Sequence, residues 1–95
     1  MTVEKVRTEL EKVVSALSSS NFGNIDSKIL EKLTKLAADA DKLGMKEGKH
    51  LIGNLIDAMK AIQEGKSKAE SGNLRLTALD FYLKKLAGTG NIKDL

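Results

Sequence analysis

The sequence predicts an all-α fold, an antiparallel up-down-up-down four-helix bundle. Apolar residues recur every three or four positions in four successive segments, which is the period of an amphipathic helix. Helix-capping residues and glycines separate these segments by connections of roughly two to eight residues, which favours antiparallel neighbours. No segment alternates as a strand would. We therefore expect one domain over residues 1–95, with residues 89–95 as a tail that carries too few apolar residues to predict order.

The first predicted helix runs from Thr2, as N-cap, to about Ser18, where a run of short polar side chains competes for backbone hydrogen bonds. Phe22, in the following loop, is expected to plug one end of the core. The apolar stripe of this helix comprises Val3, Val6, Leu10, Val13 and Leu17.

The second predicted helix begins at Asp26 or Ser27, since either side chain can cap it, and ends before Gly44. Its stripe comprises Ile29, Leu33, Leu36, Ala40 and Leu43.

The third predicted helix runs from about Met45 to Glu64 and is closed by Gly65. Its apolar arc is wide, which indicates contact with at least two other helices. Gly48 lies on this arc and Gly53 beside it. Glycine disfavours a helix interior, so the two suggest close approach of a neighbouring backbone or a bulky side chain; the alternative is that they are simply tolerated. The main stripe comprises Met45, Ile52, Leu55, Met59 and Ile62.

The fourth predicted helix has two alternative starts and is ended by Gly88. Ser67 and Glu70 fit a capping box, whereas the interruption Ser71-Gly72-Asn73 favours a start at Asn73. Its core stripe comprises Leu76, Leu79, Leu83 and Leu86.

This fourth helix carries a second apolar strip. At about 100° per residue, Leu74, Ala78 and Phe81 point away from the core stripe, and Tyr82 lies at the border of the core. Aligned exposed apolar residues often mark an interaction site, so these four residues are the predicted surface for a protein partner or a homodimer. The alternative is that Ile92 and Leu95 of the tail cover them.

The composition argues against several classes of function. A net charge of +3, with 16 basic and 13 acidic residues interspersed, does not favour nucleic-acid binding. No run is long enough to span a membrane and the first residues are too charged for a signal peptide, so we expect no membrane partner and a cytoplasmic location. Cysteine is absent, and no grouping of residues predicts a catalytic, metal or cofactor site. The chain is not expected to be an enzyme.

His50, the single histidine, is predicted to lie on the outer face of the third helix, opposite Ile52 and Leu55. A helical metal site needs a second ligand three or four residues away, where this sequence has Gly53 and Asn54. His50 is therefore interpreted mainly as an ordinary surface residue.

The segment Thr34–Gly44 resembles the histidine-phosphotransfer (Hpt) domain, a four-helix bundle with the motif His-x-Leu-Lys-Gly-x-Ala/Ser followed by a Leu-Gly turn. Leu36, Ala40 and Leu43-Gly44 match this motif. Thr34 stands at the position of the phospho-accepting histidine, Ala37 replaces the lysine, and Ala38 replaces the glycine. If the resemblance reflects kinship, it implies a domain that docks a response regulator or kinase without passing phosphate. His50 does not restore the motif, because Gly53 follows it at the third position instead of the fourth.

Two hypotheses for function follow. The first is a non-enzymatic helical interaction module that binds another protein or a second copy through the outer face of the fourth helix. The alternative is an Hpt-like phosphorelay component, either degenerate or using His50 as its phospho-acceptor.

Overall fold

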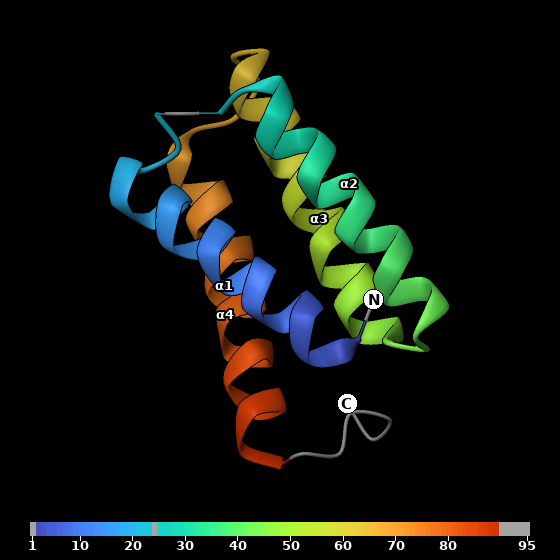
Figure 1. The fold of residues 1–95 in the computed structure, drawn as a ribbon. Helices are drawn as coiled ribbons and strands as arrows, with labels where there is room; N and C mark the ends of the chain where they lie inside the picture. Colours follow the sequence, from blue (N-terminus) through green and yellow to red (C-terminus); the bar gives the residue numbers. More distant parts are fainter. Residues whose placement is uncertain (1, 24, 90–95) are drawn as a thin grey trace.

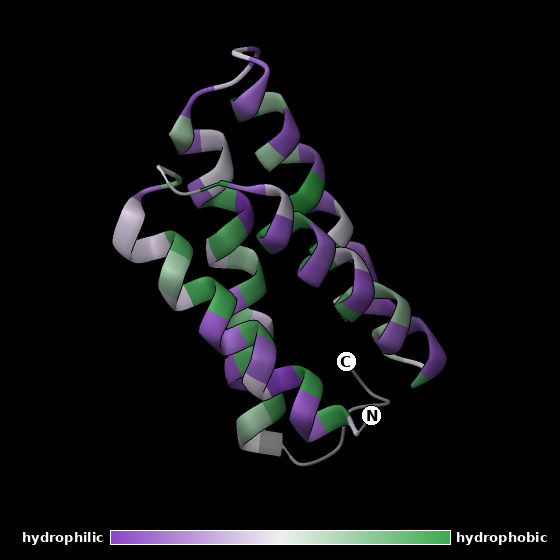
Figure 2. Ribbon diagram, turned by 45° about the horizontal axis from the view of Figure 1, so that its top comes forward, coloured by the Kyte–Doolittle hydropathy of each residue, from purple (hydrophilic) through white to green (hydrophobic). Residues whose placement is uncertain are grey.

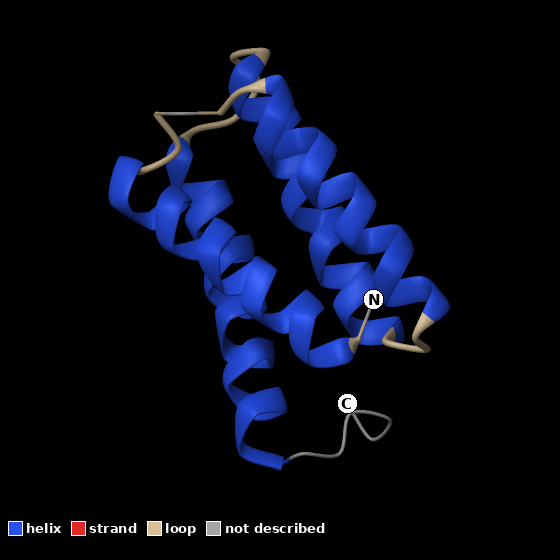
Figure 3. Cartoon of the chain, viewed as in Figure 1, coloured by secondary structure: helices blue, strands red, loops and turns tan. Residues whose placement is uncertain are grey.

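Four helices make up nearly all of the computed structural model, which describes residues 2–23 and 25–89 (Figure 1). They are α1 (Val3–Ser20), α2 (Ser27–Lys42), α3 (Lys46–Gln63) and α4 (Ala69–Thr89). Short loops join them, and the described residues contain no strand (Figure 3). The predicted all-α four-helix bundle is confirmed.

The helices form a ring in which each helix packs on two others. The pairs in contact are α1–α2, α2–α3, α3–α4 and α1–α4, while in the described part of the chain neither α1–α3 nor α2–α4 approaches closely. In Figure 1, α2 and α3 run side by side as one hairpin, and α1 crosses α4 as the other pair. The α3–α4 contact places the outer face of α4 beside α3, which is where the candidate site lies.

Side-chain caps fix the starts of α1 and α2. The Thr2 hydroxyl accepts a hydrogen bond from the Lys5 backbone N–H at 3.1 Å, and the Asp26 carboxylate accepts one from the Ile29 N–H at 2.9 Å. Asp26, and not Ser27, is therefore the cap of α2, satisfying one of the backbone donors that every helix start leaves free. At its other end α1 continues two residues past the predicted Ser18, because Asn21 takes the left-handed conformation that terminates a helix (φ 49°).

The core is built from the predicted stripes. Apolar and polar positions mix along each helix in Figure 2, and the apolar ones provide the buried side chains. Predicted stripe residues near helix ends, such as Val3, Ile29 and Ile62, are half-buried and pack against this core. Phe22 is buried, as expected of a plug. The fully or nearly fully buried apolar residues of the helices are Val6, Leu10, Val13, Leu17, Leu33, Leu36, Ala40, Ile52, Leu55, Met59, Leu76, Leu79, Tyr82, Leu83 and Leu86.

The turns on either side of α3 depend on glycine. Gly44 and Gly65 have φ values of 77° and 74°, a region that costs a side-chain-bearing residue free energy. The helix itself begins at Lys46 and ends at Gln63, one residue inside each predicted limit.

The fourth helix differs most from its prediction. It begins at Ala69, so Ser67 precedes the N-cap position and the predicted capping box is wrong. It runs without a break through Gly72, and it continues past Gly88 to Thr89. The alternative start at Asn73 is therefore wrong too, and Gly88 does not end the helix. The predicted covering residues Ile92 and Leu95 lie outside the described residues.

Polar contacts between sequence-distant residues reinforce the ring. The Lys32 ammonium lies 2.8 Å from the Glu9 carboxylate and joins α2 to α1. This hydrogen bond, with the positive charges of Lys12 and Lys32, holds the pKa of Glu9 below its ordinary value. Asn73 of α4 donates to the Asn21 side chain at 3.0 Å. Across the described helices, no segment combines the length and the apolar character needed to cross a bilayer.

Candidate interaction surface on α3 and α4

The outer strip of α4, formed by Leu74, Ala78 and Phe81, faces solvent. Leu74 is 68% exposed and Phe81 is 60% exposed, and Ala78 between them is exposed as well. No other large apolar side chain in the described ranges is classed as exposed. The three residues follow a spacing of four and three, which aligns them along one side of a helix. The opposite side of α4 carries the core stripe, so this helix is apolar on two faces.

A groove runs beside the outer strip, between α3 and α4, and encloses about 650 Å³. Its α3 wall includes Leu51, which is half-buried, and its mouth carries one acid and one base, Glu47 and Lys85. An apolar groove with a few charged groups at its edge is a form that protein and peptide partners recognise. The complete lining is Glu47, Leu51, Leu74, Thr77, Ala78, Phe81, Tyr82 and Lys85.

Tyr82 lies under this groove and is not part of the exposed strip. It is only 4% exposed, so the sequence-based expectation that it borders the core understates its burial. Among the described residues, no group forms a hydrogen bond of good geometry with its buried hydroxyl. Burial raises the pKa of Tyr82 above its ordinary value; the nearby Gly48 backbone N–H opposes the rise and the Glu47 carboxylate adds to it.

Gly48 gives Tyr82 the room that it occupies. A Cβ atom on residue 48 would stand 3.0 Å from the Tyr82 hydroxyl oxygen and 3.1 Å from a ring carbon. The close approach predicted for Gly48 is therefore confirmed. At Gly53 the alternative holds and the glycine is simply tolerated, because a Cβ atom there would meet no atom of a neighbouring described element within 4 Å. The difference arises because only the first turns of α3 face the Tyr82 ring.

Lys85 extends the strip by one turn. Its ammonium nitrogen lies 4.8 Å from the centre of the Phe81 ring, within the range of a cation–π contact. The contact holds a positive charge at the C-terminal end of the apolar strip and leaves most of the Phe81 ring exposed.

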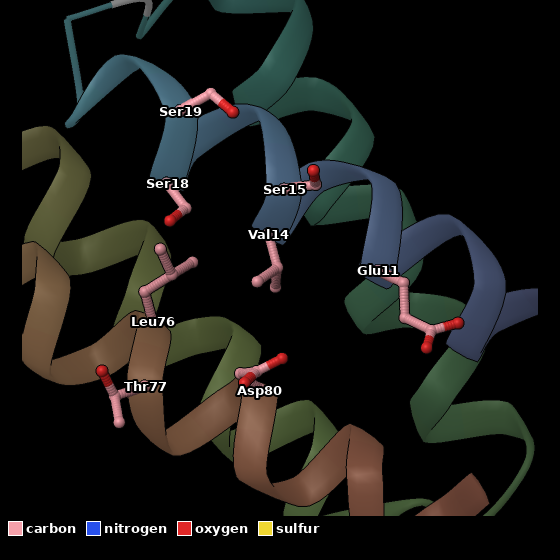
Figure 4. Close-up of a pocket in the computed structure, with 8 residues that line it drawn as sticks. All are labelled: Glu11, Val14, Ser15, Ser18, Ser19, Leu76, Thr77 and Asp80. Atoms are coloured by element: carbon pink, nitrogen blue, oxygen red, sulfur yellow. The ribbon is translucent and has the colours of Figure 1, made fainter.

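A second groove, of about 430 Å³, lies between α1 and α4 (Figure 4). Val14 and Leu76 point toward each other across it, and serine side chains of α1 line the rim. Its two carboxylates already have partners: Glu11 accepts from Arg7 at 2.9 Å, and Asp80 lies 3.1 Å from Lys84. Because both carboxylates are paired, the groove offers neither a free carboxylate base beside a serine nucleophile nor a set of free metal ligands. Local sequence pattern does not predict this groove, because its residues come from opposite ends of the chain.

The residues of the Hpt-like hypothesis lie elsewhere. His50 is exposed on α3, and Thr34 and Ala38 are exposed on α2, a helix that does not contact α4 in the described structure. The Thr34 hydroxyl donates to the Leu30 backbone carbonyl at 2.8 Å. Among the described residues, His, Asp and Glu side chains nowhere gather in a group of three that could hold a metal ion.

In comparisons with protein families, with curated proteins and with solved structures, nothing matches this chain. The Hpt resemblance therefore rests on the residues between Thr34 and Gly44 alone.

Proposed function

We propose that this chain is a non-enzymatic helical protein-interaction module whose binding surface is the outer strip of α4 with the adjoining α3–α4 groove. The observation that carries the proposal is the exposure of Leu74 and Phe81, at 68% and 60%, on one side of a helix whose other side fills the core. Exposing two large side chains on the same line is unfavourable in water unless another surface covers them.

The groove supports the same conclusion. Its apolar wall and its charged mouth fit the division of an interface into a dry centre and a polar rim. Leu51 and Tyr82 line the groove, and they belong to helices that the core fixes in place. The surface therefore exists before a partner binds. A preformed surface lowers the ordering entropy that association costs.

Site-specific photo-crosslinking tests the proposal. The photoreactive amino acid p-benzoyl-phenylalanine is introduced in the organism that encodes the chain, separately at Leu74, at Phe81 and at Glu31. Glu31 is the control, because it is exposed on α2, which does not contact α4. We expect light-dependent protein adducts of defined mass from positions 74 and 81 and none from position 31.

Adducts from none of the three positions, or equally from all of them, would contradict the proposal. The mass of a specific adduct also identifies its type: twice the mass of the chain indicates a second copy, and any other mass indicates a different protein.

The alternative, an Hpt-like phosphorelay component, is a separate proposal with one favourable observation, the exposure of His50. Phosphotransfer requires such an accessible imidazole. Incubation with acetyl phosphate or with a phosphorylated regulator should then give an acid-labile label that is lost in His50→Gln. Absence of label excludes phosphotransfer through His50 and leaves the interaction module unaffected.

A further inference from the structure

The outer strip of α4 has one large apolar side chain on either side of the small Ala78. Leu74 precedes Ala78 by four residues and Phe81 follows it by three, so two large side chains flank a small one. Lys85 lies one turn beyond Phe81, and Glu70, which is exposed, lies one turn before Leu74. The strip therefore has an acid at its N-terminal end and a base at its C-terminal end.

We propose that the occupant of this surface is a second copy of the chain, with the two α4 helices packed antiparallel about a two-fold axis near Ala78. This inference rests on the proposed function and names its partner. A two-fold contact uses the same surface patch on both copies, so the patch must be complementary to itself and each residue contact occurs twice in the interface. In the antiparallel register, Leu74 of each copy packs on Phe81 of the other, and the small Ala78 lets the helices approach.

Charge complementarity selects this direction. The register that joins Leu74 to Phe81 also brings Glu70 of each copy opposite Lys85 of the other, because each charge lies four residues beyond its apolar neighbour. A parallel pair would instead place Lys85 on Lys85 and Glu70 on Glu70. The Lys85 ammonium, held 4.8 Å from the Phe81 ring centre, is already at the end of the strip.

The size of the strip predicts a weak dimer. Leu74 and Phe81 are separated by two helical turns, or about 10 Å. Stable interfaces bury about 800 Å² per partner, and three exposed apolar residues provide much less. We therefore expect a reversible dimer with a dissociation constant weaker than about 1 μM.

Sedimentation equilibrium of the whole chain, from about 1 μM to about 1 mM, measures this dissociation constant. Phe81→Ser should weaken the dimer at least about tenfold, since it removes the largest side chain of the contact. Phe81 is exposed, so helical circular dichroism and the thermal midpoint of the variant should stay close to those of the parent. The matched control is Ala87→Ser, an exposed position of α4 outside the strip, which should leave the dissociation constant unchanged.

Charge reversal tests the antiparallel register. Glu70→Lys and Lys85→Glu should each weaken the dimer by roughly tenfold at low salt, because each converts two attractive pairs into two repulsive ones. The double variant should regain the parent dissociation constant, and both single effects should shrink in concentrated salt. In a parallel pair neither single reversal would change the constant, so that result would overturn the register.

A chain that remains monomeric at the highest concentration, or a dimer that Phe81→Ser leaves intact, would overturn the second copy as occupant. Either outcome is distinct from failure of the proposed function. That function fails only if the photo-crosslinks at positions 74 and 81 are absent or unspecific, whereas a specific adduct with another protein retains the surface and replaces the partner.

Discussion

The hydroxyl oxygen of Tyr82 lies 3.0 Å from the point where a Cβ atom on residue 48 would stand, and two ring carbons lie at 3.1 and 3.3 Å. Tyr82 on α4 and Gly48 on α3 are therefore packed closely enough that a side chain at residue 48 would require the tyrosine to shift by a few tenths of an ångström. Since Tyr82 is buried, its ring has little room to move away. This close contact between α3 and α4 involves a residue that also lines the groove.

Gly48→Ala and Gly53→Ala should differ in their effect on stability. Alanine favours a helix interior over glycine by about 1 kcal/mol, and Gly53→Ala, in open space, should gain most of it. Gly48→Ala should lose that gain to overlap with Tyr82, which makes it at least about 1 kcal/mol less stable than Gly53→Ala. Urea denaturation of both variants measures the difference. Equal stability of the two would mean that the Tyr82 ring adjusts freely.

Gly72→Ala should destabilise the bundle. A Cβ atom on residue 72 would lie 2.8 Å from the Cζ atom of the buried Phe22 ring and 2.9 Å from the Cδ1 atom of the half-buried Ile62. Overpacking of this kind costs about 1–3 kcal/mol. The control is Gly88→Ala in the same helix, where no atom of the described residues lies within 4 Å of the added Cβ atom and no loss is expected.

Phe22→Leu should partly rescue Gly72→Ala, because the shorter side chain vacates the place of the ring carbons. The free energies of unfolding of the two single variants and of the double variant give the coupling between them. Strictly additive effects would show that Phe22 is not the source of the strain.

Tyr82→Phe should increase stability and remove a loss of stability at high pH. Within the described residues the buried hydroxyl makes no hydrogen bond of good geometry, so its removal should stabilise the chain by up to about 1 kcal/mol at neutral pH. Because burial raises the pKa of Tyr82 above its ordinary value of 10.0, folding favours the neutral hydroxyl. The stability linked to this group is complete below pH 10.0 and is lost as the pH rises through that value toward the higher folded-state pKa.

The chain has a single tyrosine, so the ultraviolet absorbance of tyrosinate reports Tyr82 alone. In the folded protein this titration should have a midpoint above that of the unfolded chain in denaturant. Coincident midpoints would contradict the burial argument, and so would an alkaline loss of stability that is unchanged in Tyr82→Phe.

Local pattern predicted the helices and most of the core, because each stripe depends only on the helical period. Thr2, Asp26, Gly44 and Gly65 were also predictable, since caps and left-handed turns are set by one or two neighbouring residues. The positions of Leu74 and Phe81 away from the core follow from the same period.

Features that depend on distant residues could not be predicted in this way. Gly72 resembles a helix interruption in sequence, yet Phe22, from the loop after α1, packs against it and the helix continues. Gly48 and Gly53 are alike in sequence, and only the place of Tyr82 distinguishes them. The α1–α4 groove can be predicted only when the order of the helices around the ring is known, because that order brings Glu11 and Asp80 into the lining of the same groove.

The ring of helix contacts has a consequence for how the chain folds. Three of its four contacts join helices that are consecutive along the chain, and only α1–α4 joins its two most distant helices. A contact between consecutive helices closes only a short loop, so its entropic cost is small. The α1–α4 contact closes a loop that contains both α2 and α3, so its entropic cost is larger. Rapid formation of helical hairpins should therefore precede a single slower docking step. Mutations under the α1–α4 contact, such as at Leu76, are expected to act on that step more than those in the α2–α3 hairpin.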